Sequence, residues 1–223
     1  MYNDVSATSL QDLLDGYAAT MARHESPMVI ATLRAELKKL ADSGIARRAL
    51  GVGAKAPDFS LPDARGGTVS LTSLIAKGPA VVTFYRGSWC PFCDLQLRSY
   101  ESVLPQIRRL GAELVAISPQ TEDYALSDIE KKQLSFAVLS DAHNRVARKY
   151  GLVFVLSDAL KELQKGFGNP IPKFNGDDSW ELPIPGTFVL DRGGVVRLAH
   201  VEPDYMRRLE PASILLALHS ALS

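Results

Sequence analysis

The chain is poor in cysteine, in unbroken apolar runs and in charge of one sign. It has 2 cysteines in 223 residues, too few for the disulfide framework of a small secreted domain. No apolar stretch reaches the roughly 20 residues that a membrane-spanning helix needs, so we expect no contact with a membrane. Lysine plus arginine and aspartate plus glutamate both number 25, and no dense basic run occurs, which argues against a nucleic-acid partner.

The beginning of the sequence also lacks the pattern of a secretory signal. The segment MYNDVSATSLQDLLDGY, residues 1–17, holds no basic stretch followed by an apolar run. We therefore expect a cytoplasmic location. Hydrophobic residues make up 46% of the chain and charged residues 22%, a balance that can form a globular core.

Residues 7–50 are predicted to form two helices. Apolar residues recur at helical spacing between positions 10 and 21, and again between positions 29 and 40. Both apolar stripes must be buried, either on the protein's own domain or across a homodimer interface. The segment GVGAKAP, residues 51–57, has the composition of a linker. These features predict an N-terminal helical extension over 1–51 and one larger domain over 52–223.

Beyond residue 57, strands and helices alternate. The segment 58–71 reads as a β-hairpin around two glycines, and 187–201 reads as a second hairpin. Between them the apolar and amphipathic patterns predict strands at 80–85, 113–119 and 136–141, helices at 91–110, 122–133, 144–151 and after Ser157, and a loop over 170–183. A final helix is expected at 211–222. This order predicts a mixed, mostly parallel sheet with helices on both faces and an antiparallel edge.

The two cysteines, Cys90 and Cys93, follow the predicted strand 80–85 at the start of a helix, where α/β sheets hold their ligands. Their spacing places them one helical turn apart, close enough for a disulfide. Pro91 favours a helix that begins there, so Cys90 would lie at the positive end of the helix dipole. Arg86 would add positive charge, and both effects favour a thiolate.

We interpret this pair as a redox pair. The alternatives are two buried cysteines without chemistry, or half of a metal site. Zinc needs about four ligands, and none of the 4 histidines is suitably spaced near the cysteines. The sequence therefore predicts no metal and no other cofactor.

The segment FYRGSWCPFC, residues 84–93, resembles the active-site segment of the thioredoxin superfamily. The flanking segments APDFSLPDARGGTVSL and PIPGTFVLDRGGVVRLAHV resemble the peroxiredoxin-like, or AhpC/TSA, family over about residues 52–220. The resemblance implies a thioredoxin-like three-layer α/β/α sandwich. It also implies that a peroxide oxidises Cys90 to a sulfenic acid, that Cys93 then forms a disulfide with it, and that a thioredoxin-type dithiol reduces the disulfide. Pro185 matches the cis-proline that faces the cysteine pair in this superfamily.

The sequence departs from the family in the residues that activate the peroxide. Peroxiredoxins carry threonine or serine three residues before the reactive cysteine and proline four residues before that, whereas this chain has Gly87 and Thr83. Ser88 is the nearest hydroxyl. The arginine that the family places just before the FVLD-type strand is also absent.

Peroxide activation would therefore have to come from Arg86 or from Arg207 and Arg208, although the last two are more typical of a solvated basic face. A lowered thiol pKa is not enough, because nucleophilicity falls as the pKa falls. Hydrogen bonds to the peroxide oxygens are also needed.

Three functions remain open at this point. We expect a thiol-dependent antioxidant oxidoreductase that reduces hydrogen peroxide or organic hydroperoxides through a Cys90–Cys93 disulfide. The first alternative is a thiol–disulfide oxidoreductase in which the same cysteines attack disulfides. The second is a redox-sensing interaction module whose N-terminal helices bind a partner. Trp89 and Phe92 adjoin the cysteines, and we expect them to line a substrate surface.

Overall fold

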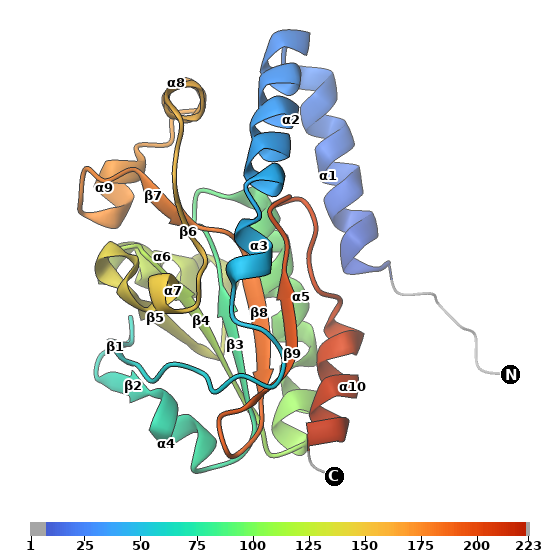
Figure 1. Cartoon of the computed structure of the whole chain (residues 1–223), viewed down its shortest axis with the longest axis vertical. Coiled ribbons are helices and arrows are strands. Elements are labelled where there is room, and N and C mark those ends of the chain that lie inside the picture. The colour runs from blue at the N-terminus through green and yellow to red at the C-terminus, as the bar shows by residue number, and fades with distance from the viewer. Residues whose placement is uncertain (1–7, 222–223) are drawn as a thin grey trace, which may run out of the picture.

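The computed structural model describes residues 8–221, so the parts of the predicted extension and domain at 1–7 and 222–223 lie outside the described residues. Figure 1 shows a central sheet with helices on both sides. The helices are α1 (Leu10–His24), α2 (Pro27–Asp42), α3 (Ile45–Arg48), α4 (Leu71–Ile75), α5 (Pro91–Arg109), α6 (Glu122–Lys132), the 3-10 turn η1 (Ala142–Asn144), α7 (Arg145–Lys149), α8 (Asp158–Gly166), α9 (Ile171–Asn175) and α10 (Pro211–Ala221). The strands are β1 (Ser60–Pro62), β2 (Thr68–Ser70), β3 (Ala80–Phe84), β4 (Glu113–Ser118), β5 (Ala137–Ser140), β6 (Val153–Val155), β7 (Glu181–Pro183), β8 (Gly186–Leu190) and β9 (Val196–Val201).

The central sheet has five strands in the order β5-β4-β3-β8-β9. Strands β3, β4 and β5 pair in parallel, whereas β8 is antiparallel to both β3 and β9. Strand β9 therefore runs in the same direction as β3, and β8 alone runs against the other strands. The mostly parallel sheet is as predicted, and the predicted hairpin forms its antiparallel edge, since the edge strand β9 pairs antiparallel with β8. The hairpin turn after β8 returns the chain to the common direction.

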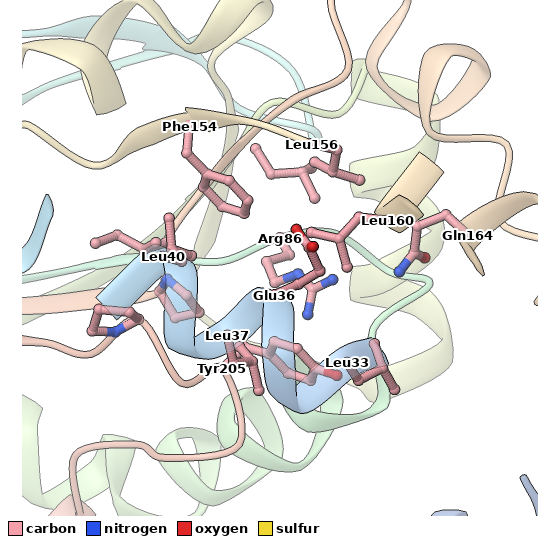
Figure 2. A pocket seen from close by; sticks show the side chains of 14 residues that line it. Leu33, Glu36, Leu37, Leu40, Arg86, Phe154, Leu156, Leu160, Gln164 and Tyr205 are labelled. Atoms are coloured by element: carbon pink, nitrogen blue, oxygen red, sulfur yellow. The ribbon is translucent and has the colours of Figure 1, made fainter. Parts of the chain in front are cut away.

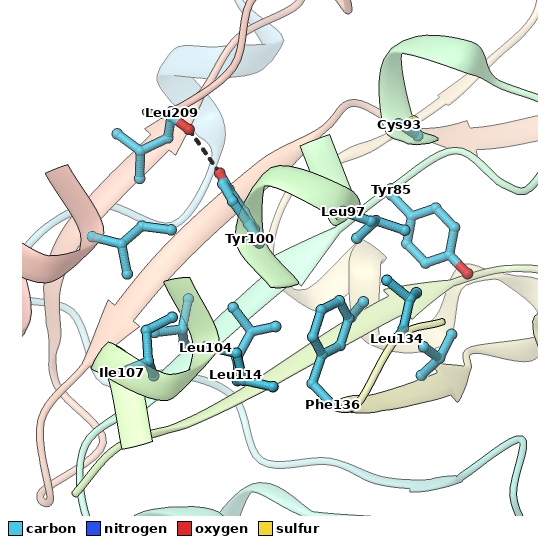
Figure 3. Packing of buried hydrophobic residues seen from close by; sticks show 14 of the residues in the cluster. Tyr85, Cys93, Leu97, Tyr100, Leu104, Ile107, Leu114, Leu134, Phe136 and Leu209 are labelled. Carbon is cyan, nitrogen blue, oxygen red and sulfur yellow. Dashed lines mark hydrogen bonds between the residues drawn. The ribbon is translucent and has the colours of Figure 1, made fainter. Parts of the chain in front are cut away.

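Successive side chains of a strand point to opposite faces of the sheet, so the hydrophobic core is divided into two layers, one on each face. On β3, Val81 belongs to a cluster that includes side chains of α1, α5, α6 and α10, whereas Val82 and Phe84 belong to one that includes side chains of α3, α4 and α7. All of these side chains are fully buried because both faces are covered. Figure 3 shows the first of these layers, where the α5 side chains Leu97 and Leu104 lie against the sheet. The structure is thus the predicted three-layer α/β/α sandwich.

Helix α1 packs its apolar stripe against the protein's own domain. Leu10 and Leu14 are buried in the same cluster as the α5 side chains. The helix begins at the capping residue Ser9, and Glu210 accepts hydrogen bonds from the backbone N–H groups of Leu10 and Gln11 at 3.1 and 2.8 Å. A carboxylate at this helix end is favourable because it faces the unpaired N–H groups and the positive end of the dipole. The homodimer remains a prediction, as does the division at residue 51.

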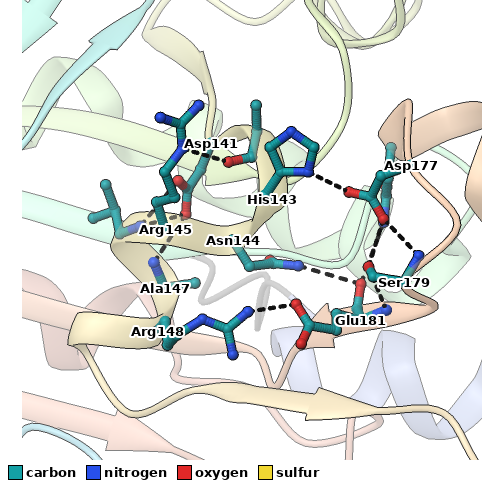
Figure 4. A network of polar contacts seen from close by, with 12 residues as sticks. Asp141, His143, Asn144, Arg145, Ala147, Arg148, Asp177, Ser179 and Glu181 are labelled. Carbon is teal, nitrogen blue, oxygen red and sulfur yellow. Dashed lines mark hydrogen bonds and ion pairs between the residues drawn. The ribbon is translucent and has the colours of Figure 1, made fainter.

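The segment 170–183, predicted as a loop, instead contains helix α9 and strand β7, which pairs antiparallel with β6. Its prolines obscure the pattern, since Pro172 lies in the first turn of α9 and Pro183 ends β7. Figure 4 shows the polar contacts that hold this segment against η1 and α7. Asn144 Nδ2 donates to the Glu181 carbonyl at 3.3 Å, and His143 Nδ1 lies 3.1 Å from an Asp177 carboxylate oxygen.

Among residues 8–221, no helix combines the length and the apolarity that a bilayer span requires.

Candidate active site

Cys90 is the residue that begins helix α5. It follows strand β3 directly after a short connection and takes the N-cap position with extended backbone angles, φ −96° and ψ 107°. Its carbonyl accepts the first helical hydrogen bonds, from the N–H groups of Cys93 and Asp94 at 3.0 and 3.1 Å. Pro91 occupies the first helical position, where a missing N–H has no cost. The local sequence therefore fixes the sulfur of Cys90 at the carboxyl edge of the sheet.

Both cysteines are free thiols, and they are almost completely buried, with exposed fractions of 2% for Cys90 and 1% for Cys93. Their sulfurs are hydrogen-bonded to each other. Burial raises the pKa of the Cys90 thiol well above its usual range, and donation of its S–H to Cys93 raises it further. Burial also disfavours the Cys93 thiolate, but the S–H of Cys90 and the guanidinium groups of Arg208 and Arg86 outweigh it and hold the pKa of Cys93 well below its usual range.

The sequence predicted a thiolate at Cys90. In the structure, burial and donation of its S–H raise the pKa of Cys90, whereas the same hydrogen bond and the two arginines lower the pKa of Cys93 against the effect of burial. The helix N-terminus does favour a thiolate at Cys90. It is outweighed because Cys93 receives the Cys90 S–H and lies beside a buried arginine.

That arginine is Arg208, which follows strand β9 and is 5% exposed. Its Nη2 lies 3.7 Å from the Cys93 sulfur, and its Nε donates to Gln96 Oε1 at 2.7 Å. Gln96 Nε2 lies 3.3 Å from the Thr83 hydroxyl oxygen, so the arginine is tied to the middle of the sheet. Arg207, in contrast, is exposed. The interpretation of both as a solvated basic face is therefore wrong for Arg208 and right for Arg207.

Arg86 is the second buried cation near the cysteines, with an exposed fraction of 7%. Its guanidinium lies between two aromatic rings, 4.7 Å from the ring centre of Trp89 and 4.1 Å from that of Tyr205. Such stacking stabilises a partly desolvated cation. Its Nε is buried and has no hydrogen-bond partner among the described residues. Arg86 is therefore a cation beside the cysteines whose hydrogen-bonding capacity is not fully used.

A pocket of about 240 Å³ opens beside Cys90. Its walls are largely aromatic, with Trp89, Phe92, Phe167 and Tyr205 around the thiol, and Pro91 and Arg86 also line it. Helix α1 and the residue that follows it supply a further wall that the sequence did not predict, formed by Tyr17, Met21 and Glu25. Cys93 does not line this pocket, so Cys90 is the thiol that a small molecule in it reaches first.

The departure from the family pattern at Gly87 has a steric reason. Gly87 has a φ of +142°, and a Cβ there would overlap the side chains of Gln120 and Trp89. A threonine therefore cannot stand at this position without moving both. Ser88 points elsewhere: Gln120 Nε2 donates to its hydroxyl at 3.2 Å, and Ser88 lines a separate cavity on the other side of Trp89.

Pro185 precedes strand β8, as predicted, but the expected cis peptide bond is absent, since no cis bond occurs within residues 8–221. Pro185 also does not line the Cys90 pocket. It lines a smaller cavity of about 30 Å³ beneath α2 (Figure 2). This cavity shares Arg86, Gln164 and Tyr205 with the Cys90 pocket. The rest of this cavity is mainly aliphatic, with Leu33, Leu37, Leu40, Phe154, Leu156 and Leu160 among its lining residues.

Within residues 8–221, no group of three or more histidine, cysteine, aspartate or glutamate side chains could hold a metal ion. The fold and the site together define a protein of the thioredoxin-like class with a buried cysteine pair at the start of a helix.

The matched family model assigns the chain more narrowly. The AhpC/TSA family model matches residues 52–199, and the chain belongs to that family. Over 148 residues it is 32% identical to the chloroplastic peroxiredoxin Q of Sedum lineare, which covers 66% of this chain and 67% of that protein. It is 31% identical to the chloroplastic peroxiredoxin Q of Triticum aestivum over 160 residues, 72% of this chain and 63% of that protein.

Two solved structures are similar in fold. One is the peroxidoxin BcpB of Mycobacterium tuberculosis, with a TM-score of 0.61 and 22% identity, covering 77% of this chain and 97% of that one. The other is described as a thiol:disulfide interchange protein DsbE of Chlorobium tepidum, with a TM-score of 0.55 and 24% identity, covering 78% of this chain and all of that one. The match to the chloroplastic peroxiredoxin Q of Suaeda salsa covers 58% of that protein, so this plant relative extends beyond the region that it shares with the chain.

The family model ends at residue 199, so it contains neither α1 nor Arg208. Tyr17 and Tyr205 also lie outside it. Sequence reasoning missed both tyrosines because their place in the pocket depends on how segments far apart in the chain pack together. The one available indication was the helical spacing of apolar residues in α1, which includes Tyr17. It indicated that this face of the helix is buried, but not which part of the protein it packs against.

Proposed function

We propose that the protein is a thiol peroxidase that reduces hydrogen peroxide or organic hydroperoxides through Cys90 and Cys93. The observation that carries the proposal is the position of Cys90, which lines a small pocket while its sulfur is hydrogen-bonded to the Cys93 sulfur beside two guanidinium groups. The similarity to peroxiredoxin Q proteins supports it.

In the first step, Cys90 attacks the peroxide. Its proton moves along the sulfur–sulfur hydrogen bond to Cys93, whose thiolate is stabilised by Arg208. The Cys90 sulfur then forms a bond to one peroxide oxygen as the O–O bond breaks, which gives a sulfenic acid and an alkoxide or hydroxide that takes up a proton. Arg86 lines the pocket, and its guanidinium can donate a hydrogen bond to the peroxide.

In the second step, Cys93, which carries the proton received from Cys90, attacks the sulfenic sulfur; a disulfide forms, and that proton leaves with the sulfenic oxygen as water. Arg208 assists because it favours the loss of the proton from Cys93 during the attack. An external dithiol of the thioredoxin type, as expected from the sequence, then returns the disulfide to two thiols. The proposal includes the cytoplasmic location and the homodimer, and size-exclusion chromatography with light scattering tests the latter.

The decisive experiment is stopped-flow tryptophan fluorescence of the reduced protein mixed with hydrogen peroxide. Trp89 adjoins Cys90 and stacks on Arg86, so oxidation of the thiol should change its emission. We expect a fast change that is absent in Cys90→Ser, and a sulfenic acid that accumulates in Cys93→Ser because no resolving thiol remains. A rate no greater than that of a free thiolate would contradict the peroxidase.

A thiol–disulfide oxidoreductase is the second candidate, and one observation favours it. No side chain stands at Gly87, where the family places the hydroxyl that binds the peroxide, and the geometry leaves no room for one. In this function Cys90 attacks a disulfide sulfur and Cys93 releases the mixed disulfide. Reduction of a small disulfide at a rate far above that of peroxide would support it.

A further inference from the structure

The Cys90 pocket has no serine or threonine hydroxyl among the described residues that line it. Ser88 is hydrogen-bonded to Gln120 outside the pocket. The lining residues that do carry a hydroxyl are two tyrosines, Tyr17 from α1 and Tyr205 from the segment after β9. Both come from parts of the chain beyond the AhpC/TSA match at 52–199. A proton source for the peroxide must therefore be sought outside the family segment.

The two tyrosines differ in their access to solvent. The ring of Tyr205 is only partly exposed, and its centre lies 4.1 Å from the guanidinium carbon of Arg86. Tyr17 is 38% exposed, and its hydroxyl takes part in no hydrogen bond within the part of the chain that the structure describes, so its proton can be replaced from water. Tyr17 is thus the tyrosine of this pocket whose proton is most directly renewed after it has been given to a bound molecule.

The ring of Tyr17 is held in place from two sides. It packs edge-on against Phe92, with ring centres 5.2 Å apart, and Phe92 lies two residues after Cys90 on the same turn of α5. Helix α1 is fixed one and two turns earlier by the buried Leu10 and Leu14 and by Glu210 at its N-terminus. The phenol is therefore positioned by the fold and is not a freely rotating surface group.

We propose that Tyr17 is the proton donor of the peroxidase reaction, a role that rests on the proposed function above. The Cys90 thiolate attacks the terminal oxygen of R–O–OH, an S–O bond forms and the O–O bond breaks. Sulfur is oxidised to the sulfenic acid, and the peroxide is reduced. The leaving RO⁻ takes the phenolic proton of Tyr17 and departs as ROH, and the phenolate is then reprotonated by water.

The electrostatics of the pocket suit this role. Partial burial raises the pKa of Tyr17, and the charge at Cys90 and the carboxylate of Glu25 raise it further. Arg86 and Tyr205 are the other charged or titratable groups that line the pocket. The phenol therefore stays protonated through the neutral range, yet it remains a far stronger acid than water or an alcohol. Proton transfer to an alkoxide or hydroxide is thus favourable.

The test uses the full chain and the variant Tyr17→Phe, which removes the hydroxyl and keeps the ring that packs on Phe92. Three reagents are mixed with the reduced protein: hydrogen peroxide, peracetic acid and iodoacetamide. Peracetic acid releases acetate, a weak base that needs no proton, and iodoacetamide reports only the reactivity and access of the thiolate. Tyr124→Phe is the matched control, because Tyr124 packs on Phe174 and lines a different cavity.

We expect Tyr17→Phe to slow the reaction with hydrogen peroxide by about 100-fold, since a positioned general acid contributes about 10²–10⁴. The rates with peracetic acid and iodoacetamide should stay within about two-fold of the wild type, and Tyr124→Phe should leave all three unchanged. An unchanged rate with hydrogen peroxide would overturn the proposal. A similar slowing with all three reagents would also overturn it, because Tyr17 would then only shape the pocket.

The same measurements distinguish failure of the proposed peroxidase function from failure of the proposed role of Tyr17. If wild-type Cys90 reacts with hydrogen peroxide no faster than a free thiolate, the peroxidase itself is refuted and the role of Tyr17 is refuted with it. A fast wild-type reaction that Tyr17→Phe leaves unchanged refutes the role of Tyr17 alone.

Discussion

Replacement of Arg208 by glutamine should shift the ionisation of the cysteine pair. Two unit charges 3.7 Å apart, the distance from Arg208 Nη2 to the Cys93 sulfur, attract by about 4.5 kcal/mol at an effective dielectric constant of about 20, and by about 1 kcal/mol in water. Both side chains are at most 5% exposed, so the first figure is the closer one. Arg86 remains and glutamine can still donate a hydrogen bond, which reduces the expected loss to about 2–3 kcal/mol.

The sign of the effect on pH dependence follows from the direction of the shift. The pKa of Cys93 is lowered in the folded protein, so the thiolate and the stability that it contributes are present above the unfolded pKa and are lost as the pH falls through the folded one. Without Arg208 this loss should occur at higher pH. A loss of about 2–3 kcal/mol corresponds to a roughly 30- to 150-fold smaller thiolate population below the pKa.

The assay is the pH dependence of thiolate ultraviolet absorbance, measured together with the rate of alkylation by iodoacetamide. Arg207→Gln is the matched control because it removes the same charge from an exposed neighbour. Arg208→Lys keeps the charge and should restore part of the wild-type profile. If Arg208→Gln titrates like the wild type, or if Arg207→Gln shifts the midpoint equally, the buried guanidinium does not stabilise the thiolate and the reasoning is refuted.

Three further changes test the surroundings of the site. Gly87→Ala should lower the free energy of unfolding by about 2–4 kcal/mol, since the positive φ and the overlap with Gln120 both oppose a side chain. A chemical-denaturation midpoint equal to that of the wild type would contradict this. Asp141→Ala should cost about 1–3 kcal/mol, because the buried carboxylate accepts from the N–H groups of Val146 and Ala147, both at 2.9 Å, and denaturant unfolding measures the loss. Glu210→Ala should cost about 0.5–2 kcal/mol by uncapping α1, and hydrogen exchange should then rise in α1 while α5 stays protected.

Most of the fold could be predicted because it depends on local patterns. The continuous apolar segment 80–85 indicated a strand buried on both faces, and β3 is fully buried from Ala80 to Phe84. Pro91 indicated the start of a helix, and α5 begins there. The position of β8 inside the sheet could not be predicted in this way, because a hairpin pattern fixes the pairing of two strands but not the edge to which the pair is added. The prolines of 170–183 favoured the prediction of a loop, because proline often interrupts helices and strands. Proline can also begin a helix or end a strand, and so α9 and β7 were not predicted.

The candidate site could be predicted only where its residues are neighbours in the sequence. Cys90, Cys93, Trp89 and Phe92 lie together because one loop and one helical turn place them there. Arg208 approaches Cys93 across 115 residues, and no periodicity in its segment distinguishes it from the exposed Arg207. The difference between the two arginines is created by the turn after β9, which directs one side chain to Gln96 and the other to solvent.

The chain departs from the family pattern in the hydroxyl before Cys90 and in the arginine before the FVLD-type strand, and the crowding at Gly87 accounts for the first departure. Because the backbone at Gly87 leaves no room for a Cβ, the loop before Cys90 cannot present a hydroxyl to the pocket. Tyr17 and Tyr205 line the pocket beside the thiol instead, and the positive charge that the family supplies from before the FVLD-type strand comes here from Arg86 and Arg208. A hydroxyl and a guanidinium are thus both present at the cysteine pair, from different elements than in the family pattern. Since Tyr17, Tyr205 and Arg208 lie outside 52–199, a fragment limited to the family segment should retain the cysteines and Arg86 but lose both tyrosine hydroxyls and one of the two guanidinium groups.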